Sequence, residues 1–267
     1  MVTIIQNYDF NFKTLGDLTI LNKQWYAQKH NYRLLELNYE LPLDDLWYWH
    51  NIRTIIKVIE EKQTDTKWLM WSDTDSLIMN GNIQVESFAD EQYLFIASLW
   101  KQSAKFEFID MQSLKYRATP QPQLHYMIHT GNFLIRNCQE AADALKSVYL
   151  NPKFRIHKAI LEWLAWDEGA LAIEYLTNAE FRKKWKMLSE DTWCTVQQTL
   201  HIFEKKKYLE GESRIRHYKH GDFIVHAMGR NPFKYGLATV SYYKIRELYP
   251  YYLEWLYEYT KNTDRNS

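Results

Sequence analysis

The stretch that most constrains this chain is residues 68–80, WLMWSDTDSLIMN, in which an apolar run stops at two carboxylates. The first four side chains are all apolar, which predicts a short strand buried on both faces of a sheet. Asp73, Thr74 and Asp75 follow at its carboxyl end, where open α/β sheets bind ligands. Carboxylate oxygens suit a hard divalent cation that bridges the protein to substrate phosphates. We therefore predict a metal–diphosphate site for a nucleotide-sugar; a simple turn, which Asp, Thr and Ser also favour, is the alternative.

Composition bounds the class of protein. The chain has 267 residues, of which 46% are hydrophobic, so it can bury a large core. Its 33 Lys and Arg residues balance 33 Asp and Glu residues, and no overall field favours a nucleic acid. Two cysteines, Cys138 and Cys194, argue against a disulfide framework and fit a reducing compartment, with a pair between them left open.

The chain is expected to be soluble and cytoplasmic. No apolar run approaches the roughly twenty residues that span a bilayer. The N-terminus enters a strand directly, without a basic head or an apolar signal core. The Tyr-rich tail, together with the basic run 205–207, leaves peripheral contact with a membrane open.

The order of the predicted elements is that of a doubly wound α/β sheet. Strands are expected at 2–5, 33–37 and 68–71. Two helices are expected between them. The first, at 16–30, has Leu18 and Leu21 on its buried side, and the second, at 44–62, is capped by Asp44. Further on, the pattern predicts strands at 92–99, 132–137 and 222–226, loops at 101–123, and helices at 139–149, 154–176 (interrupted near 167–169) and 240–260, with Pro250 as a break or kink.

His226, at the end of the late strand, is a second candidate metal ligand. It follows an apolar run and precedes Gly229, a residue that lets the backbone approach a ligand closely. A neutral imidazole can complete a carboxylate-bound Mn²⁺ site. A packed strand-end histidine with no ligand is the alternative.

Seven residues are candidates for holding the donor. Asp73 and Thr74 lie in the acidic turn itself. Gly229 follows the late strand, and so do Arg230 and Lys234, which would neutralise a diphosphate or remain solvated surface cations. Gln6 and Asn7 belong to a polar loop expected after the first strand.

Asp167 and Glu168 lie inside the apolar segment 163–173, where an unpaired acid is expensive to bury. A helix N-terminus or a polar cavity would explain them. Capping accounts well for Asp167 and leaves Glu168 without a role. A carboxylate facing the anomeric carbon of a sugar could act as a nucleophile or stabilise an oxocarbenium-like transition state, so both are candidate catalytic residues.

The acceptor-binding candidates precede a strand. His129, Thr130, Gly131 and Asn132 either line a sugar pocket or form a strand-entry turn without a function. Tryptophans stack on sugar faces as well as in cores. Trp166 is therefore a further candidate, together with Trp100 and Trp163.

Taken together, these segments resemble glycosyltransferase family 34, a family of retaining α-galactosyl-, α-mannosyl- and α-xylosyltransferases. The resemblance runs from about Trp49 to Gly229. Residues 68–80 are similar to the family's tryptophan-rich strand and metal motif, and 130–138 (TGNFLIRNC) to its most specific string. Residues 167–171 and 223–229 match an Asp-Gln-x-x-Leu segment and a late His-x-x-Gly segment. His129 stands where the family usually has asparagine, and Glu168 where it has glutamine; Asn51 and Asn231 replace basic residues.

The resemblance implies a GT-A fold of the α/β class, with a mixed central sheet and helices on both faces. It implies one catalytic domain over 1–267, with a nucleotide-sugar-binding half (1–100) and an acceptor-binding, catalytic half (101–267) that ends in a helix. It also implies Mn²⁺ or Mg²⁺ held by Asp75 and His226, with Asp73 nearby. The expected reaction moves a hexose or pentose from a UDP-sugar, or a GDP-sugar, to a glycan or glycolipid hydroxyl.

Three other readings stay open from sequence alone. A metal-dependent phosphohydrolase would use the same acidic turn but needs more ligands. A non-catalytic carbohydrate-binding protein would explain the aromatic residues alone. A peripheral membrane protein would use the tail. The change from glutamine to Glu168 adds a sharper hypothesis, a double displacement through a glycosyl-enzyme intermediate.

Overall fold

The computed structural model describes residues 1–8, 12–37, 49–102, 108–110, 115–117, 125–155, 166–189, 192–197, 218–227 and 237–264. The described strands are β1 (Val2–Asn7), β2 (Arg33–Leu37), β3 (Trp68–Ser72), β4 (Ser76–Ile78), β5 (Phe95–Gln102), β6 (Phe108–Asp110), β7 (Lys115–Arg117), β8 (His125–Ile128), β9 (Asn132–Arg136), β10 (Trp185–Ser189), β11 (Cys194–Gln197) and β12 (Ile224–Ala227). The described helices are α1 (Lys13–His30), α2 (His50–Glu60), α3 (Gln139–Tyr149), α4 (Pro152–Arg155), α6 (Trp166–Thr177), α7 (Ala179–Arg182) and α10 (Leu237–Asp264), with a 3₁₀ turn, η3, at Val85–Phe88.

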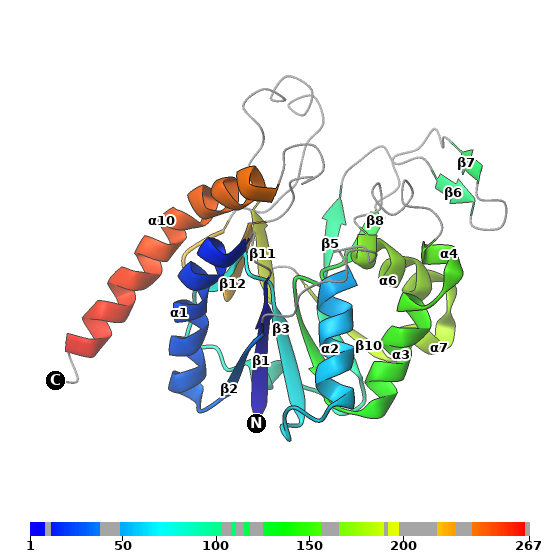
Figure 1. The fold of residues 1–267 in the computed structure, drawn as a ribbon, viewed down its shortest axis with the longest axis horizontal. Coiled ribbons are helices and arrows are strands. Elements are labelled where there is room, and N and C mark those ends of the chain that lie inside the picture. Colours follow the sequence, from blue (N-terminus) through cyan, green and yellow to red (C-terminus); the bar gives the residue numbers. More distant parts are fainter. Residues whose placement is uncertain are drawn as a thin grey trace.

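A mixed sheet of seven strands forms the centre of the described part of the chain (Figure 1). Its order is β10-β5-β9-β3-β1-β2, and β8 also pairs with β5. β1 runs parallel to β2 and β3, as expected for β-α-β units. β9 is antiparallel to both of its neighbours, β3 and β5.

Helices cover both faces of this sheet, with α1 on one side and α2 and α3 on the other (Figure 1). Side chains of β3 alternate between the faces, as the period of a strand requires. Leu69 and Trp71 pack in the cluster that contains α2 and α3, whereas Trp68 and Met70 pack in the cluster that contains α1. The predicted strand buried on both faces is confirmed, since all five residues of β3 are buried.

A second, three-stranded sheet in the order β11-β12-β4 lies beside the end of β3. β4 follows the acidic turn directly and pairs antiparallel with β12, which sets His226 opposite Ser76. Two segments that are 150 residues apart in sequence therefore meet at the turn that carries Asp73 and Asp75.

Several predicted elements differ from the observed ones. Residues 101–123 were expected to be loops, but β5 extends to Gln102, and β6 pairs with β7. The predicted loop at Gln6 and Asn7 is wrong, because both belong to β1 and are buried. The interruption expected near 167–169 falls in the first turn of α6, where acids suit the helix dipole. α10 continues through Pro250.

The buried side of α1 was also predicted wrongly. Leu21 is 50% exposed, while Thr19, Asn22 and Lys23 are fully buried. Thr19 and Lys23 are buried because they bond to the turn between β3 and β4, and Asn22 because it bonds to the backbone of Ile78 in β4. On α2 the predicted apolar stripe is confirmed at Ile52, Ile55 and Ile59. The expected cap, Asp44, lies outside the described residues.

Cys138 and Cys194 both carry thiols rather than a shared disulfide. Among the described residues, no helix combines the length and the apolarity needed to cross a bilayer.

Candidate active site

The acidic turn 73–75 is fixed through its backbone by three different elements. The Asp73 amide donates to the carbonyl of Gly131 at 2.7 Å, and the Asp75 carbonyl accepts from the Ala227 amide at 2.9 Å. From α1, Thr19 Oγ1 donates to the Thr74 carbonyl and Lys23 Nζ to the Asp73 carbonyl, both at 2.7 Å. The carboxylates are therefore presented by a rigid frame.

His226 lies directly against both carboxylates. Its Nε2 is 2.9 Å from Asp75 Oδ1 and 3.6 Å from Asp73 Oδ2. One donor atom from each of the three residues lies within 4.8 Å of the others. Two carboxylates and an imidazole are a donor set that suits Mn²⁺, with Mg²⁺ as the harder alternative. These residues fit the cation that the sequence predicts.

Lys244 of α10 completes the surroundings of Asp75. Its Nζ donates to Asp75 Oδ2 and to the Ala227 carbonyl. Burial alone would raise the pKa of Asp75, but the charges of Lys244 and His226 outweigh it and hold the pKa well below its usual range. Asp75 is therefore a permanent anion at the centre of the site.

Asp73 has the opposite tendency. Loss of hydration, followed by the charge of Asp75, raises the pKa of Asp73 to about 7. Trp71 Nε1 donates to Asp73 Oδ1 at 2.6 Å and orients the carboxyl group.

Burial lowers the pKa of Lys23 to about 7, although Asp73 and Asp75 partly offset that effect.

Gly131 lies directly against the side chains of His226 and Asp73. A Cβ at this position would be 2.5 Å from His226 Cε1 and 2.8 Å from Asp73 Oδ2. The absence of a side chain therefore lets β9 approach the histidine and the turn. The sequence predicted that Gly131 would allow a close approach to a sugar. In the structure the close neighbours of Gly131 are the side chains of His226 and Asp73.

Asp167 and Glu168 lie in the first turn of α6, next to the segment that precedes β9. Asp167 Oδ2 accepts from Thr130 Oγ1 at 2.8 Å and from Asn51 Nδ2 at 2.7 Å. Burial raises the pKa of Asp167 to about 6 despite these two donors. Glu168 Oε1 accepts from the Thr130 amide at 3.2 Å. Burial and the charge of Asp167 raise the pKa of Glu168 well above its usual range.

The acceptor-binding candidates at 129–132 are buried, and His129 and Asn132 contact other protein groups. His129 Nε2 is 2.8 Å from His226 Nδ1. Asn132 donates to Ser76 Oγ at 2.8 Å and accepts from Ser72 Oγ at 3.0 Å. Their contact with an acceptor stays a prediction, whereas their bonds tie β9 to the acidic turn and to β12.

Of the donor candidates, Thr74 lies in the turn and donates from Oγ1 to the Asn7 carbonyl at 3.2 Å. Gln6 Oε1 accepts from Lys23 Nζ at 2.5 Å, and Asn7 Nδ2 donates to Thr54 Oγ1 at 2.8 Å. Gln6 and Asn7 thus lie beneath the turn. The remaining predicted residues fall outside the part of the chain that is described: Gly229, Arg230, Lys234 and Trp163, and the side chains of Trp100 and Trp166.

Sequence reasoning missed Lys23, Lys244 and Asn51 as parts of this site. Lys23 and Lys244 lie on helices, where a lysine normally faces solvent. Asn51 was noted only as a departure from the family pattern. No sequence signal distinguishes these three from ordinary surface residues.

Comparison with known proteins follows the same segments. Residues 1–235 match the galactosyl transferase GMA12/MNN10 family. An uncharacterised α-1,2-galactosyltransferase of Schizosaccharomyces pombe is 27% identical over 156 residues, which are 53% of this chain and 41% of that protein. The matched part thus spans about two fifths of that relative. α10, which carries Lys244, begins beyond the matched residues.

Two solved structures share the fold. A glycosyltransferase involved in the glycosylation of the major capsid of PBCV-1 has a TM-score of 0.52 at 15% identity, over 91% of this chain and 98% of that chain. Mouse xyloside xylosyltransferase 1 has a TM-score of 0.50 at 8% identity, over 85% of this chain and 98% of that chain. These likenesses confirm the predicted GT-A type of fold.

Proposed function

We propose that this chain, which belongs to the galactosyl transferase GMA12/MNN10 family, is a metal-dependent, retaining glycosyltransferase. Its donor is a nucleotide-diphosphate sugar; a UDP-sugar is the first candidate and a GDP-sugar the second. The enzyme transfers a hexose or a pentose. Its acceptor is a hydroxyl of a glycan or glycolipid. Galactose is the first sugar to test, because the relative in Schizosaccharomyces pombe is described as an α-1,2-galactosyltransferase.

The observation that supports this proposal is the convergence of Asp73, Asp75 and His226 at the carboxyl end of β3. A divalent cation bound there would act as a Lewis acid toward the diphosphate leaving group. Lys244 keeps Asp75 ionised, Trp71 orients Asp73, and Gly131 leaves room for the imidazole. The protein groups are thus arranged before any donor binds.

The test is a screen of nucleotide-sugars with Mn²⁺ that measures released nucleotide diphosphate. We expect release that EDTA abolishes and that Asp75→Asn lowers at least a hundredfold. Asp90→Asn is the matched control. Asp90 lies away from the site, where its Oδ2 is 3.2 Å from Lys186 Nζ, so this variant should leave the rate unchanged. Release that persists in EDTA and in Asp75→Asn would overturn metal dependence. Glycan binding without any release would favour the carbohydrate-binding protein.

For the retaining step, the candidate nucleophile is Glu168, with Asp167 beside it. One carboxylate oxygen of Glu168 would form a bond to C1 of the sugar as the nucleotide diphosphate leaves. The acceptor hydroxyl would then displace the carboxylate and release its proton to the nucleotide diphosphate or to water. The position of Glu168 supports this role: its Oε1 accepts from the Thr130 amide at 3.2 Å, and the next residue, Gly131, accepts from the Asp73 amide of the acidic turn at 2.7 Å.

Glu168→Gln should keep donor binding and lower transfer at least a hundredfold, because an amide cannot form the glycosyl ester. Donor binding is measured by calorimetry, transfer by product formation, and the intermediate by the mass of the protein after mixing with donor. Near-normal turnover in Glu168→Gln would dismiss the nucleophile and leave the rest of the proposal intact.

Peripheral contact with a membrane rests on one face of α10. Tyr249, Leu253 and Tyr257 recur every four residues and are 51%, 46% and 58% exposed. Such a stripe could hold the enzyme at a surface that carries a glycolipid acceptor. Co-sedimentation with anionic vesicles tests it: wild type should sediment, and a variant with serine at all three positions should not. Equal sedimentation of the two would exclude this face.

A further inference from the structure

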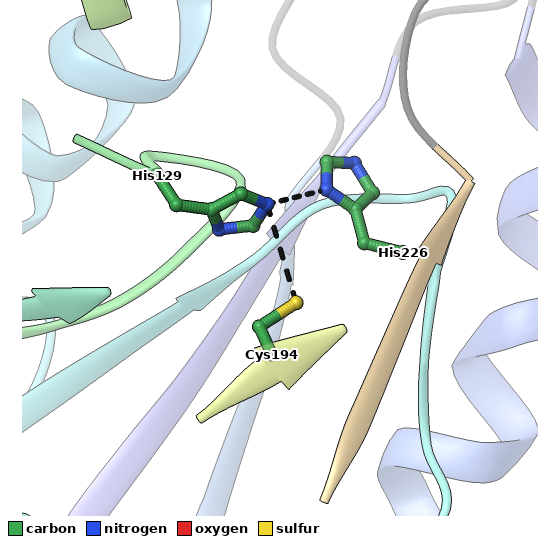
Figure 2. Close-up of side chains that lie close together, drawn as sticks. All are labelled: His129, Cys194 and His226. Carbon is green, nitrogen blue, oxygen red and sulfur yellow. Dashed lines mark hydrogen bonds between the residues drawn. The ribbon is translucent and has the colours of Figure 1, made fainter. Parts of the chain in front are cut away.

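A second group of metal-binding side chains lies beside the acidic turn, and the proposed reaction does not use it as a group. His129, Cys194 and His226 point toward one another from the turn before β9, from β11 and from β12 (Figure 2). The exposed fractions of these residues are 0%, 1% and 3%. His129 Nε2 lies 2.8 Å from His226 Nδ1 and 4.0 Å from Cys194 Sγ.

We propose that these three side chains form a binding site for a thiophilic divalent cation, Zn²⁺ being the natural candidate. Their donor atoms all lie within 4.8 Å of one another. Zn–N bonds of about 2.0 Å and Zn–S bonds of about 2.3 Å imply spacings of about 3.3 Å between nitrogens and about 3.6 Å between nitrogen and sulfur in a tetrahedron. The observed spacings from His129 Nε2, 2.8 Å to nitrogen and 4.0 Å to sulfur, lie on either side of these values, and the third spacing, between Cys194 and His226, is below 4.8 Å.

The donor types separate this site from the acidic one. A sulfur and two imidazole nitrogens favour Zn²⁺, whereas the carboxylates of Asp73 and Asp75 suit Mn²⁺ or Mg²⁺. Binding would convert the Cys194 thiol to a thiolate and release its proton to solvent, because the thiolate is the ligand. Water would take the position that three protein ligands leave open.

His226 belongs to both groups through opposite nitrogens. Its Nε2 faces Asp75 at 2.9 Å, and its Nδ1 faces His129 at 2.8 Å. A neutral imidazole has one nitrogen lone pair in the ring plane and one N–H. Binding of the hard cation through Nε2 places the proton on Nδ1. Binding of Zn²⁺ through Nδ1 places the proton on Nε2, where it is donated to Asp75.

The two ions therefore compete for one imidazole. This consequence rests on the proposed function, since it assumes that His226 binds the cation used with the donor. Zn²⁺ in the second site would withdraw His226 from the acidic site and lower the affinity for Mn²⁺. Zinc would act as an inhibitor that does not occupy the donor's own metal position.

The site itself is tested by titrating the metal-free protein with Co²⁺. Cobalt substitutes for zinc and gives a thiolate-to-metal charge-transfer absorption only when a cysteine sulfur binds it. We expect this absorption in wild type, its loss in Cys194→Ser, and at least tenfold weaker binding in His129→Asn. Cys138→Ser is the matched control and should retain the absorption, because Cys138 precedes α3 and is not part of the group.

Absence of the absorption in wild type, or its survival in Cys194→Ser, would overturn the site. Thermal melting of each variant shows whether a loss reflects unfolding. Serine can still accept the contact that Asn132 Nδ2 makes with Cys194 Sγ at 3.7 Å, so Cys194→Ser is the mildest removal of the sulfur.

Competition is tested by following free Mn²⁺ by electron paramagnetic resonance while Zn²⁺ is added. Release of bound Mn²⁺ should need at least tenfold more Zn²⁺ in Cys194→Ser than in wild type. Equal amounts in both would mean that zinc only replaces manganese at the acidic turn, and would overturn the competition. Failure of wild type to bind Mn²⁺ would instead count against the proposed function, because the cobalt titration involves neither Mn²⁺ nor the donor.

Discussion

At the residue scale, Gly131 determines how closely β9 approaches the ligand group. Any side chain there would contact His226 Cε1 and Asp73 Oδ2 at 2.5 and 2.8 Å. Neither neighbour can move away easily, because both belong to the same bonded group around Asp75. Because Gly131 has no side chain, β9 can lie this close to His226 and Asp73.

Gly131→Ala should weaken Mn²⁺ binding at least tenfold and destabilise the fold by about 1–3 kcal/mol, as overpacking does. Calorimetric titration with Mn²⁺ and urea denaturation measure the two effects. Gly221→Ala is the control: its φ of 97° makes a side chain strained, but nothing lies within 4 Å of the added Cβ. It should lower stability and leave Mn²⁺ binding unchanged. Equal Mn²⁺ affinity of Gly131→Ala and wild type would contradict the argument.

Asp167 makes stability depend on pH. Its pKa is about 6 in the folded protein and near the ordinary 3.8 when unfolded, so the folded state holds the proton more tightly. The free energy of unfolding therefore falls as pH rises from about 4 to about 6. Asp73 and Glu168, whose pKa values are also raised by burial, add to this decrease, whereas the lowered pKa of Asp75 acts in the opposite sense, mainly below about pH 4.

The Asp167 contribution between pH 4.5 and 6.5 is about 2 kcal/mol, since each unit of full proton difference is worth about 1.4 kcal/mol. Asp167→Asn should remove that decrease in the metal-free protein. Urea denaturation in EDTA at the two pH values measures it for both proteins. A variant with the same pH dependence as wild type would show that Asp167 is hydrated in the folded state.

At the element scale, α1 and α10 are the two helices that support the acidic turn and its histidine. α1 contributes Thr19 and Lys23 to the turn, and α10 contributes Lys244 to Asp75. The helices contact each other through aromatic rings: Trp255 of α10 lies 5.9 Å from Trp25 of α1, edge to face. This packing holds Lys244 in place from a position outside the site.

Trp255→Ala should destabilise the protein by about 3 kcal/mol, because a buried indole is lost and a cavity remains. Tyr257→Ala, on the exposed side of the same helix, should change stability by less than about 1 kcal/mol. Chemical denaturation of both variants provides the comparison. Similar small losses in the two would mean that α10 is not held by its aromatic face.

At the scale of the whole molecule, one sheet joins the two predicted halves, 1–100 and 101–267. β9 comes from the second half and lies between β3 and β5 of the first. β4 likewise pairs with β12, from the far end of the chain. Each predicted half therefore lacks strands that the other supplies, and the separate functional roles of the halves stay a prediction.

Because of this exchange of strands, residues 1–100 expressed alone should not fold. Without β9, β3 loses a neighbour, and without β8, β9 and β10, β5 loses every partner described for it. Amide dispersion in the NMR spectrum of the fragment measures this, with the full chain as the reference. A dispersed spectrum and a cooperative melt of the fragment would establish an independent half.

The sequence by itself determined the parts of this protein that depend on local pattern. The run 68–71 predicted a strand buried on both faces, and the spacing of Ile52, Ile55 and Ile59 predicted one side of a helix; both predictions are confirmed. The acidic turn follows from the point where the apolar run stops. Resemblance added that His226, far along the chain, belongs beside it, as the 2.9 Å contact with Asp75 shows.

Only the tertiary structure decided which polar residues are buried at the site. Thr19, Asn22 and Lys23 share one face of α1, and Lys244 belongs to α10. These polar side chains bond to the acidic turn, to the strand after it, or to Asp75. The physical reason is that a buried polar group is stable wherever another segment supplies its partner. The period of apolar residues along a helix predicts which face is buried. The hydrogen-bond partner of a buried polar side chain depends instead on which segments the sheet brings together.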